Sequence, residues 1–223
     1  MQDELIKFFE NFVSSRRARL FHKVLNKRTS YITVAIEDIY QSHNASAVLR
    51  TCDCFGIHDI HIIENRNVFE VNPDVALGSS KWLNINKYTS NKNNTNPALK
   101  ELKNQGYRLV ATLPDENAVA LPDFSIEKGK FALLFGTELT GLSTEAKELA
   151  DEYLHIPMHG FTESFNISVS AAIIIHYLVN KLHDSNISWG IAQERKKEIY
   201  LQWLKNTVKH ADKLEQKFLN SQK

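Results

Sequence analysis

The sequence predicts an α/β fold in which a mostly parallel sheet is covered by helices on both faces. From residue 31 onward, short apolar and β-branched runs alternate with helical stretches, and Gly, Pro or Asn residues separate them. Residues 131–135, Phe-Ala-Leu-Leu-Phe, are apolar throughout, which is typical of a strand buried on both faces. In such a fold, ligands bind at the carboxyl ends of the strands.

The pattern gives the order of the elements. Strands are expected at residues 32–36, 60–63, 83–85, 109–112, 131–135 and 153–156. Helices are expected at residues 45–55, 97–105, 144–149 and 167–182, with a further helical stretch over 187–219. The Asn-rich segment 84–96 is expected to be a long loop.

The length and composition are those of one main domain with small appendages. The chain has 223 residues, of which 43% are hydrophobic and 24% charged, as in ordinary globular proteins. We expect a basic helical extension at 1–29, a central domain at 30–182 and a second helical extension at 183–223.

The sequence favours a cytoplasmic protein without a metal. No run approaches the roughly 18 apolar residues of a membrane span, and the first residues do not have the order of a signal peptide. The two cysteines, Cys52 and Cys54, fit neither a disulfide framework nor a zinc site, so both are expected to be reduced helix residues.

A local basic segment lies near the start of the chain, although the net charge is only +1. Its cationic side chains are Arg16, Arg17, Arg19, Lys23, Lys27 and Arg28, and residues 16–28 include no Asp or Glu. Apolar residues recur there at intervals of three and four, which predicts one or two amphipathic helices. The segment is either an RNA contact or an ordinary solvated helix face.

Residues 136–143, which follow the apolar strand 131–135, form the first candidate ligand loop. Their glycine spacing resembles that of a phosphate loop, but Leu142 stands where that loop needs Lys, and Glu138 would repel phosphates. Gly136 and Gly141 allow a tight turn close to a neutral or cationic ligand, such as a sulfonium cofactor. An ordinary turn after a buried strand is the alternative.

Residues 156–166 form the second candidate loop and lead directly into an apolar helix. Ser164 or Asn166 is expected to cap that helix. Capping alone would explain either residue, but the loop also presents Met158, His159 and Glu163, and its polar groups are more than a cap requires.

The third candidate is the helix that starts near Asn44, the expected N-cap, and stops at Gly56. Arg50 stands on this helix beside apolar residues, where a guanidinium needs a partner. Either Asp53 pairs with it at i+3, or Arg50 faces a cleft and binds phosphate.

Together these segments resemble the SpoU family of RNA ribose methyltransferases, within the knotted SPOUT superfamily. The first family motif matches Asn44, Arg50, Phe55 and Gly56, and the second matches Gly136, Glu138 and Gly141. The third matches 156–158 and 164–168, with Phe165 in place of the usual Leu. The segments 50–53 and 78–82 and the short helical extensions are most similar to the members that methylate guanosine 18 of tRNA.

The resemblance implies a trefoil knot at the C-terminal end of the sheet, a homodimer and S-adenosylmethionine as cofactor. The cofactor contacts that it implies are Thr112, Leu113, Gly136, Ile156, Met158 and Phe165. It also implies 2′-O-methylation of a ribose in tRNA, with Arg50 activating the 2′-hydroxyl.

The reaction would be an in-line displacement, which depends on the alignment of nucleophile, methyl and sulfur. Because arginine normally stays protonated, we favour Arg50 as a phosphate clamp that stabilises the developing alkoxide, with direct base catalysis as the alternative. Asn44, Glu138, Ser164 and Asn166 would position Arg50 and the ribose. Ribosomal RNA methylation and a non-catalytic RNA-binding protein are the competing functions.

Overall fold

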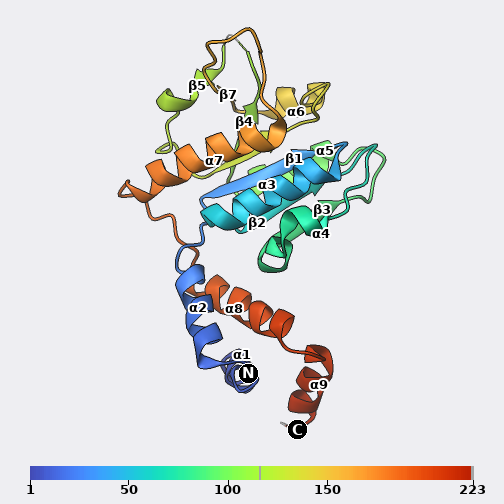
Figure 1. The fold of residues 1–223 in the computed structure, drawn as a ribbon, viewed down its shortest axis with the longest axis vertical. Helices are drawn as coiled ribbons and strands as arrows, with labels where there is room; N and C mark the ends of the chain where they lie inside the picture. The colour runs from blue at the N-terminus through green and yellow to red at the C-terminus, as the bar shows by residue number, and fades with distance from the viewer. Residues whose placement is uncertain (116, 222–223) are drawn as a thin grey trace. The chain divides into compact units, whose positions relative to one another are not determined.

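The computed structural model describes residues 1–115 and 117–221. These residues form two compact units (Figure 1). One unit contains residues 29–189. The other joins residues 1–28 with residues 190–221, so the two segments that the sequence divides into separate extensions cluster as one helical unit.

The larger unit is built on a seven-stranded sheet within the described residues. All its strand pairs are parallel, as predicted. The strand order is β3-β2-β1-β6-β4-β7-β5. The strands are β1 (Ile32–Glu37), β2 (Asp59–Ile63), β3 (Asn84–Tyr88), β4 (Arg108–Thr112), β5 (Val119–Ala120), β6 (Phe131–Phe135) and β7 (Glu152–His155).

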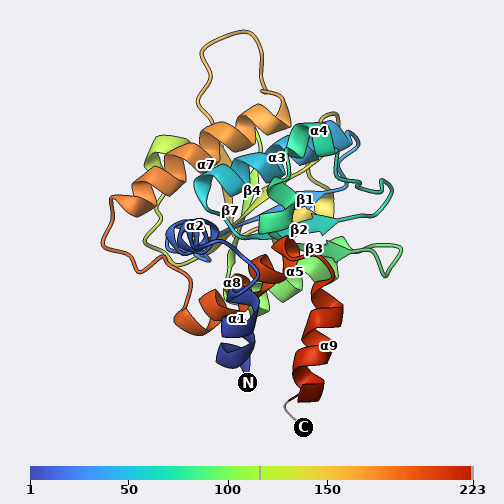
Figure 2. The ribbon, with the colours of Figure 1, turned by 60° about the horizontal axis from the view of Figure 1, so that its bottom comes forward.

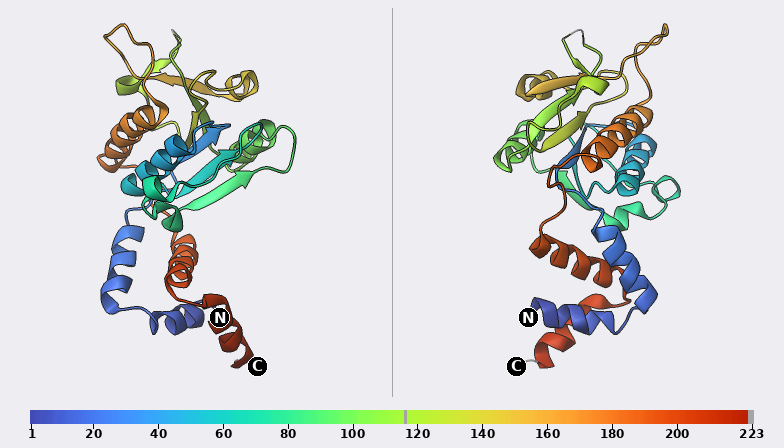
Figure 3. Two further views of the ribbon diagram at one scale, coloured as in Figure 1. Left: turned by 45° about the vertical axis from the view of Figure 1, so that its right-hand side comes forward. Right: turned by 90° about the vertical axis from the view of Figure 1, so that its left-hand side faces the viewer.

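Helices cover both faces of this sheet, which confirms the predicted layers (Figure 3). α3 (Ser42–Phe55) and α7 (Ile167–His183) pack side by side on one face, while α5 (Thr95–Asn104) and α6 (Thr144–Leu149) lie on the other. Successive side chains of β1 point to opposite faces of the sheet. Val34 and Ile36 therefore enter the core under α3 and α7, and Ala35 enters the core under α5 and α6. Burial on both faces explains why β6 is apolar at every position and why every residue of β1 is buried.

The irregular parts of the sheet unit depart from the sequence prediction. The segment 84–96 is not mainly loop, because it contains β3 and the start of α5. β3 is an edge strand with no buried residue, since Lys87 is exposed and the other four residues are half-buried, so its Asn and Lys side chains can reach water. The short elements α4 (Pro73–Ala76), η1 (Ser79–Trp82), η2 (Leu121–Asp123) and β5 are too short to produce a periodic pattern.

The helical unit consists of α1 (Gln2–Glu10), α2 (Ser15–Leu25), α8 (Gln193–Thr207) and α9 (Ala211–Ser221) in the part of the chain that the structure describes (Figure 2). α1 and α2 both pack against α8. Phe9, Phe21 and Trp203 are buried there, with an edge-to-face contact between Phe21 and Trp203 at 5.6 Å. Among the described helices, none has the length and apolar character needed to cross a bilayer.

Candidate functional site

The carboxyl ends of β1, β6, β4 and β7 lie next to one another in the sheet, and the candidate loops follow them. Thr112 ends β4 and donates its hydroxyl to the Leu134 carbonyl at 2.7 Å, and the Leu113 N–H donates to the Leu154 carbonyl at 3.1 Å. Gly136 directly follows β6, and Ile156 directly follows β7. Parallel strands therefore bring four of the expected cofactor residues to one edge.

Asn44, Glu138 and Asn166, one from each motif, form a hydrogen-bonded chain. The Asn44 amide nitrogen donates to Glu138 Oε1 at 2.6 Å, and the Asn166 amide nitrogen donates to Asn44 Oδ1 at 3.2 Å. Asn166 also caps α7, because its side-chain oxygen accepts from the Ser168 N–H at 2.8 Å. These hydrogen bonds fix the orientations of the Asn44 and Asn166 amides and join three segments that are far apart in sequence.

The predicted N-cap role of Asn44 is wrong. α3 begins at Ser42, its N-cap is Gln41, and Asn44 lies within the first turn. The buried Asn44 amide is therefore not occupied by a cap interaction and bonds to Glu138 and to Gln41 Oε1 instead. The predicted stop at Gly56 is confirmed by its left-handed conformation, with φ of 81°.

Arg50 lies on α3 with its side chain exposed. The Arg50 side chain makes no hydrogen bond or ion pair with any other described residue, so the pairing with Asp53 is not formed. Ser164 is also exposed and has no side-chain hydrogen bond within the described chain. The structure thus assembles Asn44, Glu138 and Asn166, and leaves Arg50 and Ser164 open to a ligand.

The 136–142 loop is folded tightly back on itself. Thr137 and Gly141 exchange two backbone hydrogen bonds, each of 3.0 Å. A Cβ atom at Gly136 would lie 2.2 Å from the Gly141 carbonyl carbon, so no other residue fits there without moving the loop. Gly141 has φ of 66°, which favours glycine. This turn presents Glu138 to Asn44.

The 156–165 segment offers unpaired polar backbone. It extends away from the sheet between β7 and α7 (Figure 2). In the described structure, the backbone N–H and C=O groups of residues 156–165 make no hydrogen bond to main-chain atoms of turns, loops or caps elsewhere in the chain. Phe161 and Phe165 are exposed within it. These backbone groups and aromatic rings are available to hold a ligand with polar edges and apolar faces.

The charge of the two loops fits a sulfonium cofactor. Residues 136–143 and 156–166 contain Glu138 and Glu163 but no Lys or Arg. A cationic ligand is favoured beside them over a phosphate group. The exposed Phe165, the half-buried Ile156 and the nearby Met158 add apolar groups to the 156–166 segment.

The predicted basic residues lie on and after α2. Arg16, Arg17, Arg19, Lys23 and Lys27 lie on the surface. Arg28 differs, because its side chain is only 1% exposed and its guanidinium lies 5.4 Å from the centre of the Trp203 ring. Arg28 is therefore not part of the exposed basic surface, unlike the other five residues of the predicted segment.

Sequence reasoning missed a set of polar residues beneath the site. Asp38, which is buried at the end of β1, has φ of 53° and accepts the backbone N–H groups of residues 65–67. Burial raises the pKa of Asp38, but these bonds and the Arg66 side chain outweigh it and hold that pKa below its ordinary value. Glu37, Thr95 and Ser143 were also missed. One sequence feature could have indicated them, namely the two consecutive carboxylates Glu37 and Asp38 at the end of the mostly apolar run 32–36.

Comparisons with known proteins agree with this geometry. Residues 31–176 match the SpoU rRNA Methylase family. The chain is 42% identical over 213 residues to a tRNA (guanosine(18)-2′-O)-methyltransferase of Borreliella burgdorferi, covering 94% of this chain and 95% of the relative. It is 35% identical over 159 residues to the enzyme of that name from Thermus thermophilus, covering 71% and 79% of the two chains.

A solved structure has the same fold over most of both chains. It is the crystal structure of the A. aeolicus TrmH/SpoU tRNA modifying enzyme, with a TM-score of 0.77 and 29% sequence identity. The match covers 87% of this chain and 98% of that protein. With the three motifs joined at one edge of the sheet and the family match spanning most of the sheet unit, the chain belongs to the SpoU rRNA methylase family.

Proposed function

We propose that this chain transfers a methyl group from S-adenosylmethionine to the ribose 2′-hydroxyl of guanosine 18 in tRNA, and that it acts in the cytoplasm. The hydrogen-bonded chain of Asn166, Asn44 and Glu138 carries the proposal, because it links the three motif segments at the ligand-binding edge of the sheet. The relatives named above, one of them similar over nearly the whole chain, support the same reaction and substrate.

The cofactor is proposed to bind at the ends of β4, β6 and β7. Thr112, Leu113 and Gly136 would contact it from the first two strands, and Ile156, Met158 and Phe165 from the third. When bound, S-adenosylmethionine supplies an electrophilic methyl group on a positively charged sulfur. The absence of Lys and Arg from both loops avoids repulsion of that charge.

Arg50 is proposed to contact the RNA beside the reacting ribose. Its planar guanidinium can bind a phosphate with two hydrogen bonds, and its charge can stabilise the ribose 2′-oxygen as the hydroxyl proton passes to solvent water. Its exposure and lack of an internal partner among the described residues keep it available for this role. Asn44, Glu138, Ser164 and Asn166 would position the ribose, which is the main requirement of an in-line displacement.

A homodimer and a trefoil knot are also part of the proposal. Exposed apolar side chains in the sheet unit include Leu139, Phe161, Phe165, Val169 and Tyr177. α7, which carries the last two, is apolar on most of its circumference, and such a helix is normally buried. Sedimentation of the full chain should give twice the monomer mass, and a monomer at micromolar concentration would contradict the dimer.

Labelled methyl transfer to separated unmodified tRNA and ribosomal RNA tests the substrate. We expect label in tRNA as 2′-O-methylguanosine, located by nuclease mapping. Label in ribosomal RNA alone would favour the alternative substrate. Binding of tRNA without any methyl transfer would favour a non-catalytic RNA-binding protein.

Arg50 variants test the assigned chemistry. Arg50→Ala should lower kcat/KM by roughly 100-fold or more, because a charge-assisted interaction with the transition state is removed. Arg50→Lys should recover only part of this activity, since lysine cannot make the planar two-bond interaction. Both variants should melt within about 1 °C of wild type, because an exposed, unpaired side chain contributes little stability. Full activity of Arg50→Ala would contradict the role.

A further inference from the structure

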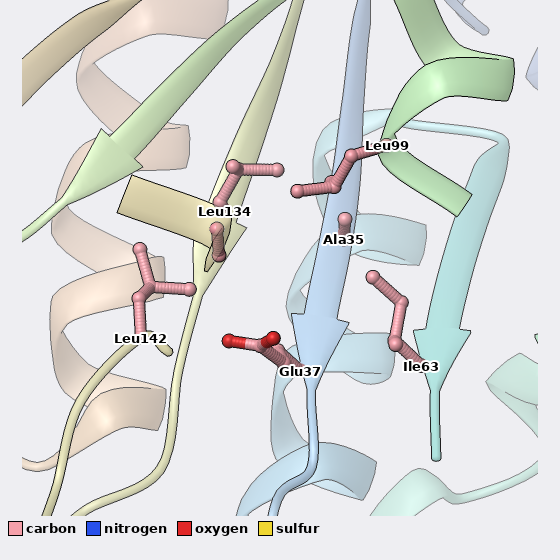
Figure 4. Close-up of a pocket in the computed structure, with 7 residues that line it drawn as sticks. Ala35, Glu37, Ile63, Leu99, Leu134 and Leu142 are labelled. Carbon is pink, nitrogen blue, oxygen red and sulfur yellow. The ribbon is translucent and has the colours of Figure 1, made fainter. Parts of the chain in front are cut away.

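Glu37 is a buried carboxylate that the proposed chemistry does not use. It ends β1, and its side chain is 4% exposed. Figure 4 shows its carboxylate pointing toward Leu142, with Ala35, Leu134 and Ile63 around it. A charge in such apolar surroundings is costly unless it is well hydrogen-bonded, so its partners reveal its purpose.

Within the described residues, the Glu37 carboxylate accepts three hydrogen bonds, and two of them come from Ser143. The Ser143 N–H donates to Oε2 at 2.8 Å, and the Ser143 hydroxyl donates to Oε1 at 2.7 Å. The Thr95 hydroxyl also donates to Oε1, at 2.5 Å. Ser143 in turn caps α6 by accepting from the Ala146 N–H at 3.1 Å. Glu37 therefore holds the junction between the 136–142 loop and α6 against the end of β1.

This junction fixes one end of the loop that carries Glu138. The other end is fixed because Gly136 directly follows β6, which pairs with β1. Between these ends the loop is closed by the two backbone hydrogen bonds between Thr137 and Gly141. The backbone of Gly136 also lies directly against that of Gly141, so the loop cannot widen there without losing this contact. A closed loop held at both ends moves as a unit, so the place of Glu138 depends on Glu37.

We propose that Glu37 is a positioning residue that holds the 136–142 loop in its cofactor-binding place and thereby sets the affinity for S-adenosylmethionine. This inference rests on the proposed function, because it takes the loop to be part of the cofactor site. Glu37 acts through Ser143 and touches neither substrate nor cofactor. A purely structural role would instead lower stability without a specific effect on cofactor affinity.

Two isosteric variants separate these roles. Glu37→Gln keeps the volume but puts an amide N–H₂ where one oxygen accepts hydrogen bonds, so the interaction with Ser143 is weakened. Thr95→Val removes the third hydrogen bond to the Glu37 carboxylate, together with the bond that the Thr95 hydroxyl accepts from the Asn65 amide, and leaves both bonds from Ser143. It is the matched control, because it perturbs the same carboxylate from the side of α5 and not from the side of the loop.

The measurement is the Kd of S-adenosylmethionine for the full chain by isothermal titration calorimetry, beside the melting temperature of each protein. We expect Glu37→Gln to raise Kd about tenfold, the effect of weakening a hydrogen bond to a charged group. Thr95→Val should leave Kd within about twofold while lowering the melting temperature to a similar degree. Ser143→Ala serves as the second test of the link if Glu37→Gln does not fold, and it should raise Kd in the same direction.

An unchanged Kd in the Glu37 and Ser143 variants would overturn the proposal. An equal rise in Thr95→Val would overturn it too, because the effect would then be general loosening of the site. Cofactor binding by wild type without methyl transfer to tRNA would refute the proposed function alone. Failure of wild type to bind S-adenosylmethionine would refute both.

Discussion

Asn44 is the residue at which the three motif segments meet. Its amide donates to Glu138 and accepts from Asn166, and it is only 4% exposed. A buried amide whose donor and acceptor are both engaged has a single orientation. The bond from Asn44 to the Glu138 carboxylate is charge-assisted and is the stronger of the two interactions.

Glu138→Gln tests that bond. The new amide can place a donor opposite the Asn44 donor, so we expect a roughly 10- to 100-fold lower kcat/KM, the cost of removing a hydrogen bond to a charged group. Steady-state methyl transfer measures the change. Glu148→Gln is the matched control, because Glu148 lies on α6 and loses the same charge. Equal activity of the two variants would show that the Glu138 charge has no positioning role.

At the scale of elements, the edge of the sheet contains a buried histidine. His61 on β2 is 2% exposed, and its Nδ1 lies 3.0 Å from the hydroxyl of Tyr88 on β3. Burial lowers the pKa of His61 from 6.5 to about 4, against a smaller opposing effect of Asp59. The neutral imidazole therefore joins β2 to β3 at neutral pH.

The stabilisation that neutral His61 provides between β2 and β3 should weaken in acid. Below pH 6.5 the unfolded chain binds a proton that folded His61 does not bind until about pH 4. The free energy of unfolding should then fall by at most about 1.4 kcal/mol per pH unit within that window. Urea unfolding at pH 7 and pH 5 measures the change. His61→Gln, which cannot titrate, should lack this part of the pH dependence, and an unchanged dependence would contradict the assignment.

The sequence predicts elements with strong local patterns better than edges and turns. β6 and α6 have the predicted limits, because an all-apolar strand and a clear Ser143 cap define them. β3 extends beyond its expected range, since its alternation is hidden by Asn and Lys side chains at the half-buried edge. Asn44 has the residue type of a cap, but a carboxylate 94 positions away in the sequence binds its side chain.

At the scale of the whole molecule, we propose a division of the RNA contacts, in which the sheet unit holds the cofactor and the reacting ribose and the helical unit binds the tRNA backbone. The motif loops belong to residues 29–189, whereas the surface cations Arg16, Arg17, Arg19, Lys23 and Lys27 belong to the helical unit. With a net charge of +1, the chain has no general attraction to RNA, so a local cluster must supply it.

The double variant Arg16→Ala/Arg19→Ala tests this division. Both side chains are exposed and lie one turn apart on α2. The slope of log tRNA affinity against log salt should shrink by about 0.7–0.9 for each phosphate that the variant no longer neutralises. The Kd of S-adenosylmethionine should not change. Lys92→Ala/Lys100→Ala removes two exposed charges from the other unit, and an equal drop in tRNA affinity in this control would contradict a specific basic surface.

The sequence predicts those site residues that belong to the family motifs. Asn44, Glu138 and Asn166 stand at characteristic spacings, and the structure joins them by hydrogen bonds. Glu37 and Ser143 were not predictable as a pair, because their hydrogen bonds span 106 positions and depend on β6 lying beside β1. Strand order is a long-range property that local periodicity does not contain.

Two tRNA transcripts that differ in one atom test the central claim most directly. One has guanosine at position 18 and the other 2′-deoxyguanosine, so only the first offers the 2′-hydroxyl. Labelled S-adenosylmethionine and the full chain are incubated with each transcript. We predict label in the first transcript and none in the second. Equal label in both would place the reaction at another atom or nucleotide, and no label in either would contradict the proposed activity.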